Sequence, residues 1–64
     1  MYTVEEATTG ANVNDFPTLR ALAYFCEGMT ESDLRQYHFR MGDKWISWVV
    51  VMREINRLPS EVPN

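Results

Sequence analysis

The sequence is poor in the residues that stabilise many small domains through disulfides or bound metal ions. Its 64 residues include one cysteine, one histidine, three glycines and three prolines. A single cysteine excludes an internal disulfide, and with one histidine the chain lacks the soft ligands of a structural zinc site. A domain of this length buries only about 60 % of its unfolded surface, so it is marginal without such supports. Self-association is the remaining source of stability that the sequence suggests.

Long apolar runs are also missing. The longest unbroken run is Trp48 to Met52, well short of the roughly 20 residues that a bilayer-spanning helix needs. The first residues, Met1 to Glu6, are acidic and lack the positive region and apolar stretch of a signal peptide. We therefore expect a soluble, cytoplasmic protein without a membrane partner, and a single free thiol fits a reducing compartment.

Groups arranged for catalysis are not visible in the sequence. No glycine-rich phosphate loop occurs, and no nucleophile, base and orienting group stand at local spacing. Cys26 lies between Phe25 and Glu27 with no basic neighbour to lower its pKa, which predicts a buried, inert thiol. The sequence thus predicts a protein that is not an enzyme, with no catalytic residue, no metal site and no cofactor.

The residues that are present indicate a folded and weakly acidic chain. Hydrophobic residues make up 45 % of the sequence, too many for a disordered segment, and the net charge is -3. Residues 1–33 hold six acidic and one basic side chain, a sum of -5, whereas residues 34–64 hold three and five, a sum of +2. Such asymmetry orients a protein on a charged partner or pairs two copies, although ordinary solvated surfaces also produce it.

The pattern along the chain divides it into an arm, a domain and a tail. Residues 1–14 carry isolated Val4 and Val13 among polar residues and Gly10, which predicts a flexible acidic arm. Residues 15–59 are expected to form a single helical domain, and residues 60–64 a short tail.

Two helices are predicted in the first part of that domain. For residues 16–27, apolar residues recur at helical spacing between a possible cap at Asp15 and a stop at Gly28. For residues 31–41, Thr30 and Asp33 resemble a capping box, and Leu34, Tyr37 and Met41 follow at spacings of three and four.

The segment of residues 43–59 has two interpretations. As a helix over residues 44–58 it begins after Asp43, carries an apolar stripe and ends before Pro59. As a strand, Trp45 to Val51 is rich in β-branched and aromatic residues, and Gly42-Asp43 turns a hairpin over residues 37–51. A strand that is apolar on both faces is hard to cover in so small a protein. We therefore expect an all-α domain of three helices, with an α+β fold as the alternative.

The predicted function is protein binding. The first turns of the third helix are apolar nearly all round, which favours burial in the core or against a partner, and tryptophan is enriched among interface hot spots. The candidate partner-binding residues are Trp45, Ile46, Trp48 and Val50, together with an acidic corner of Glu27, Glu31 and Asp33. We predict a small acidic interaction module that modulates a larger protein of unknown identity, as phage or plasmid accessory regulators do, and a homodimer is left open.

DNA binding is the alternative function. Residues 20–37 resemble a helix-turn-helix unit, with Ala23, Gly28, Leu34 and Tyr37 at its core and turn positions. The side chains offered to DNA are then Arg35, Gln36, His38 and Arg40. Glu31 and Asp33 would repel phosphates at the start of the reading helix, and the isoelectric point near 4.9 is low for this class. Nucleic acid is therefore the less favoured partner.

A second resemblance concerns the order of several short segments. Thr18-Leu19, Ser32-Asp33-Leu34, Asp43 and Leu58-Pro59-Ser60 are similar to the Hha-type modulators of bacterial nucleoid proteins. Those are small helical proteins that act by binding another regulator. The resemblance implies a helical fold and a modulator of a nucleoid protein.

Overall fold

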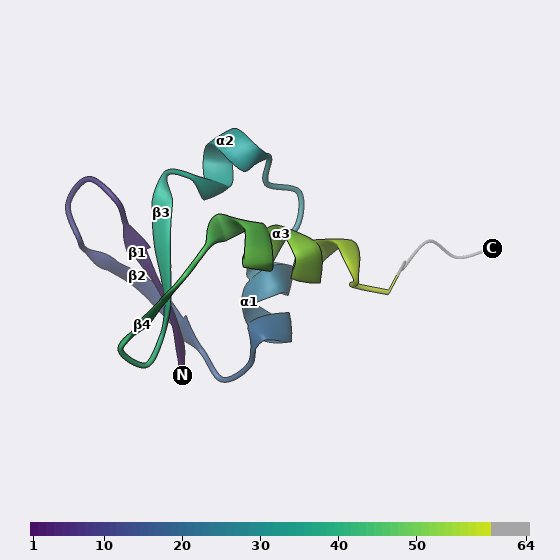
Figure 1. Ribbon diagram of the computed structural model, residues 1–64, viewed down its shortest axis with the longest axis horizontal. Helices are drawn as coiled ribbons and strands as arrows, with labels where there is room; N and C mark the ends of the chain where they lie inside the picture. Colours follow the sequence, from purple (N-terminus) through teal and green to yellow (C-terminus); the bar gives the residue numbers. More distant parts are fainter. Residues whose placement is uncertain (60–64) are drawn as a thin grey trace.

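Two β-hairpins form one antiparallel sheet, and the helices gather on one side of it (Figure 1). This arrangement is seen in a computed structural model, which describes residues 1–59. The elements are β1 (Tyr2–Glu6), β2 (Asn12–Phe16), α1 (Leu19–Phe25), α2 (Glu31–Leu34), β3 (Tyr37–Met41), β4 (Lys44–Ile46) and α3 (Trp48–Asn56). The strand order β2-β1-β3-β4 makes β1 and β3 the two central strands.

The predicted all-α fold is wrong, because the protein is a small α+β domain. Residues 1–14, predicted as a flexible arm, contain β1 and most of β2. Val4 is the reason: it pairs with Asn14 on one side and Phe39 on the other, and its side chain is fully buried. Val13 lies at a β-bulge, where the register between β1 and β2 shifts, and is partly exposed.

The predicted helix over residues 31–41 ends after one turn. The capping box of Thr30 and Asp33 is present and starts α2, and Leu34 closes that helix in the core. From Tyr37 the chain is extended, because β3 pairs along its whole length with β1 and, from Phe39 on, with β4. The partner strand β1 is more than 30 residues away in sequence, so a local pattern does not reveal it.

The predicted helix over residues 44–58 is divided into a strand and a shorter helix. Gly42 has φ 62°, as the first central residue of a tight hairpin turn requires, and Gly42-Asp43 joins β3 to β4. The hairpin that we kept as an alternative over residues 37–51 thus occurs, but its second strand ends at Ile46. Ser47, not Asp43, caps α3 by accepting from the Val49 amide.

The first predicted helix is present with tighter ends. It was expected over residues 16–27 and spans Leu19–Phe25 as α1. Thr18 caps it by accepting from the Ala21 amide at 3.0 Å, whereas Asp15 lies in β2. Gly28 follows the helix with φ 89°, the left-handed conformation expected after a helix end.

The core lies between the sheet and the helices. Val4 and Phe39 supply its sheet side, and the helical segments cover them. The residues with at most 1 % exposure are Val4, Leu22, Ala23, Cys26, Leu34, Phe39 and Val51. Trp48, Met52 and Ile55 of α3 pack around this cluster. The core therefore joins both hairpins to all three helices.

Two further expectations concern the membrane and the tail. Within residues 1–59, none of the helices has the length and apolar character that crossing a bilayer requires. The predicted tail over residues 60–64 lies outside the described residues.

Replacing Phe39 tests the proposed centre of the core. Because Phe39 is the largest fully buried side chain, Phe39→Ala should cost about 3–5 kcal/mol of unfolding free energy. In so small a domain that loss leaves the chain largely unfolded, which far-UV circular dichroism and urea titration would show. Met41→Ala, on the same strand but at an exposed position, is the control and should change little. Equal urea midpoints for the two variants would contradict the assignment.

Candidate functional site: an aromatic groove at the sheet edge

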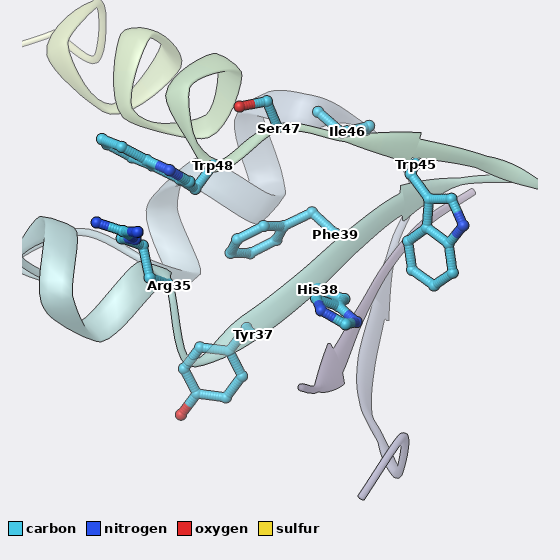
Figure 2. A pocket seen from close by; sticks show the side chains of 8 residues that line it. All are labelled: Arg35, Tyr37, His38, Phe39, Trp45, Ile46, Ser47 and Trp48. Carbon is cyan, nitrogen blue, oxygen red and sulfur yellow. The ribbon is translucent and has the colours of Figure 1, made fainter. Parts of the chain in front are cut away.

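A hollow with a volume of about 670 Å³ lies where the second hairpin meets the helices. We call it the aromatic groove. Its lining residues are Arg35, Tyr37, His38, Phe39, Trp45, Ile46, Ser47 and Trp48 (Figure 2). Five of these eight side chains are aromatic rings, counting the imidazole of His38.

The groove exists because the two strands of the hairpin differ in length. Ile46, the last residue of β4, pairs with Phe39, whereas β3 reaches back to Tyr37. The chain leaves the sheet at Ser47 and turns into α3, so the edge of β3 is left open at its start. Arg35 after α2 and Trp48 at the start of α3 flank this opening. The ring of Phe39 extends from β3 toward them (Figure 2).

Trp45 is the most exposed large side chain of the groove. It is 64 % exposed and lies on the sheet face that the helices leave uncovered, in the same row as Arg40. The His38 ring meets it edge-on with ring centroids 5.4 Å apart, and the Arg40 guanidinium lies 5.9 Å from its ring centroid. The indole is thus held between a histidine and an arginine although most of it faces solvent.

Arg40 is itself fixed by two strong contacts. Its Nη2 lies 2.8 Å from Oε2 of Glu5 on β1, and its Nη1 donates to the carbonyl oxygen of Gly42 at 2.8 Å. Both terminal nitrogens are therefore occupied, and the plane of the guanidinium is fixed. The central strand β1 in this way controls the position of Trp45 on the edge strand.

The same sheet face carries an acidic group with a shifted pKa. Thr3 donates to Asp15 at 2.8 Å, and Asn12 donates to the same carboxylate oxygen at 3.3 Å. The bond from Thr3, followed by that from Asn12, lowers the pKa of Asp15 below its ordinary value of 3.8, and the positive charge of Arg40 adds to the effect. Asp15, Thr3, Arg40 and Trp45 thus form one row across all four strands.

Arg35 is the charged side chain of the groove. Arg35 and His38 line it, and no carboxylate does. Glu31 forms an exposed ion pair with Nη1 of Arg35 at 3.2 Å, outside the lining. A smaller hollow of about 390 Å³ continues on the other side of Arg35 and Tyr37 and includes Glu6. The carboxylates nearest to the groove, Glu6 and Glu31, therefore lie beyond its lining.

The structure brings together only part of the predicted partner-binding set. Trp45, Ile46 and Trp48 meet in the groove. Val50 is 38 % exposed on α3 and does not line it. The three acidic residues do not line the groove and have separate local settings: Glu27 follows α1, Glu31 pairs with Arg35, and Asp33 is used in the capping box.

The residues predicted for DNA contact lie along one segment but face different surroundings. Arg35 and His38 line the aromatic groove, Gln36 lines the smaller hollow, and Arg40 is engaged by Glu5. The helix expected to present them has four residues and ends at Leu34. These side chains therefore lie just after α2 and on β3 and not on a reading helix.

Three lining residues were missed by the sequence analysis: Tyr37, Phe39 and Ser47. Tyr37 was placed in a helical stripe, and Ser47 was the polar exception in the alternative strand over residues 45–51. The signal that identifies them is the Gly42-Asp43 turn, because a hairpin register from that turn pairs Phe39 with Ile46. Ser47 then follows as the residue at which the strand ends.

Cys26, predicted to be a buried and inert thiol, does not line the groove. Its side chain is fully buried in the core, so the predicted burial is confirmed. Burial also raises the pKa of its thiol from 9.0 to about 11. Among residues 1–59, no three His, Cys, Asp or Glu side chains lie close enough together to hold a metal ion.

Comparison with known proteins identifies no relative of this chain. No protein-family model, no curated protein and no solved structure matches the chain. The helix-turn-helix and Hha-type resemblances imply helical folds, whereas the chain forms a four-stranded sheet. The function is therefore argued from the groove itself.

Thr3→Val tests the hydrogen bond that lowers the pKa of Asp15. Losing the hydroxyl donor should move that pKa up toward 3.8, measured by NMR titration of the carboxyl group. A lowered pKa stabilises the fold above the unfolded-state value, and this stabilisation is lost as the pH falls through the folded-state value. The stability difference between wild type and Thr3→Val should therefore shrink in acid. Thr8→Val, in the exposed hairpin loop, is the control, and an unchanged Asp15 titration in Thr3→Val would refute the account.

The reactivity of Cys26 provides a second test. A pKa near 11 leaves roughly a hundredfold fewer thiolates at pH 8 than the ordinary value, and burial excludes the reagent as well. A disulfide reagent such as Ellman's should therefore modify the native protein only slowly and the guanidinium-unfolded protein at once. Rapid modification of the native thiol would show that Cys26 is accessible.

Proposed function

We propose that the protein is a non-enzymatic interaction module that binds a partner protein at the aromatic groove and modulates it. The observation that carries the proposal is Trp45, a tryptophan that is 64 % exposed and yet held in place by neighbouring side chains. Tryptophan and arginine are the residues most enriched at interface hot spots. An indole that already packs against two neighbours loses less conformational entropy on binding than a free one, which favours affinity.

The groove has the size and lining of a site for a short peptide segment. Its volume of about 670 Å³ lies within the range of roughly 300–1,000 Å³ that is usual for ligand pockets. Ile46 and Trp48 supply apolar surface, while Arg35 and Ser47 supply polar groups at the margin. Every lining residue lies on a helix or a strand or directly beside one, which makes the site rigid.

The other predictions made from the sequence stay as proposals. DNA binding is the alternative, and it is less favoured because the net charge is -3 and Arg40 is paired with Glu5. A homodimer, the activity of an accessory regulator and a cytoplasmic location are compatible with a small domain that works through one surface.

The test is selection of ligands from a random-peptide display library with the wild-type protein. Selected peptides should shift the NMR signals of Tyr37, Trp45 and Trp48. Trp45→Ala should weaken their binding at least tenfold, because truncating a hot-spot tryptophan typically costs about 2 kcal/mol or more. The fold should persist, since Trp45 is mostly exposed.

Tyr24→Ala is the matched control, an exposed aromatic side chain on α1 that lies outside the groove. It should bind the selected peptides as the wild type does. Failure to select any peptide, or equal binding by Trp45→Ala, would overturn the proposal. A salt-sensitive shift of a short DNA duplex would instead favour the DNA-binding alternative.

A further inference from the structure

We infer that the partner segment is an extended, proline-containing peptide that carries an acidic residue. This inference rests on the proposed function and names the chemistry of the ligand. Three properties of the groove lead to it: its aromatic side chains, its donor-only indole and guanidinium groups, and the positive charge of Arg35.

The walls suit a segment that is already extended. Tyr37, Trp45 and Trp48 come from β3, β4 and α3, and they offer ring surfaces at separate points along the groove (Figure 2). Proline-rich segments adopt the extended polyproline conformation before binding and dock in aromatic-lined grooves, so they lose little entropy. A helical ligand is less suitable, because the groove runs over a sheet edge and offers no long apolar trough.

Three of the polar side chains that line the groove are donors only, whereas Tyr37, His38 and Ser47 can both donate and accept. The indole N–H groups of Trp45 and Trp48 and the guanidinium of Arg35 donate and do not accept. Within residues 1–59, neither indole N–H donates to a protein acceptor. A proline-containing segment is complementary to such a surface, because proline has no N–H and its peptide carbonyls are acceptors without a donor beside them.

The charge of the groove selects the ionisable residue of the ligand. Arg35 and His38 line it without a carboxylate, and the ion pair with Glu31 uses only Nη1 of Arg35. The remaining guanidinium N–H groups are suited to a carboxylate. Arg35 and Trp48 line the same groove, so an acidic residue is expected close to the proline that contacts Trp48. A cationic side chain, which aromatic rings also attract, would meet Arg35.

Three synthetic peptides test the inference directly. The first is Gly-Pro-Pro-Glu-Pro-Pro-Glu-Pro-Gly, the second has alanine in place of each proline, and the third has lysine in place of each glutamate. The first should bind roughly tenfold more tightly than either of the others, because it alone combines rigidity with the matching charge. Binding is measured from the NMR shifts of the two indole N–H groups.

Arg35→Gln should reduce the affinity for the glutamate peptide about fivefold and leave the lysine peptide no weaker. Arg57→Gln, which removes the same charge at the far end of α3, is the matched control and should have no effect. Equal or tighter binding of the lysine or alanine peptide would overturn the inference, and so would an unchanged affinity in Arg35→Gln.

The library selection separates this inference from the proposed function. Selected peptides that depend on Trp45 but lack proline and acidic residues would overturn the inference and support the proposed function. Selection of no peptide, together with no binding of the three synthetic peptides, would overturn both. Selected peptides that share a proline and an acidic residue would support both.

Discussion

The contact between Val4 and Phe39 is the constraint on which the rest of the structure depends. The two residues pair across the central strands, one from each hairpin, and both side chains are buried. Leu22, Leu34 and Val51 bring one residue from each helix to the same cluster. With no disulfide to join the hairpins, burial of this cluster is what holds the two halves of the chain together.

The groove follows from this core, because strand β3 serves both. Alternation along a strand sends successive side chains to opposite faces, so Phe39 enters the core while His38 and Arg40 face outward. Those two flank Trp45, and Glu5 on the neighbouring strand anchors Arg40. A rigid centre thus positions an exposed aromatic ring at the edge, and little motion is left to be lost when a ligand binds.

The sequence predicted local features well and long-range pairing poorly. The capping box at Thr30 and the left-handed Gly28 depend on neighbouring residues, and both are present. The pairing of Val4 with Phe39 joins residues 35 positions apart, and no window of the sequence contains both. Trp45 and Trp48 were selected as binding residues by type, but their grouping with Tyr37 required the strand register. The Gly42-Asp43 turn indicates this register, but the apolar run that forms α3 favoured a helix over the whole segment of residues 44–58.

The bulge at Val13 makes one of the two sheet edges irregular. On β2, the bulge breaks the regular spacing of the outer edge, and the Asp15 amide already donates to the Asn14 side chain at 2.8 Å. Pro17 follows directly. Such an edge is a poor template for another strand, while β4 at the opposite edge has only three residues. Neither edge of the sheet is therefore suited to adding strands from another copy of the chain. The exposed aromatic surface can remain accessible to a ligand without the molecule polymerising through its sheet.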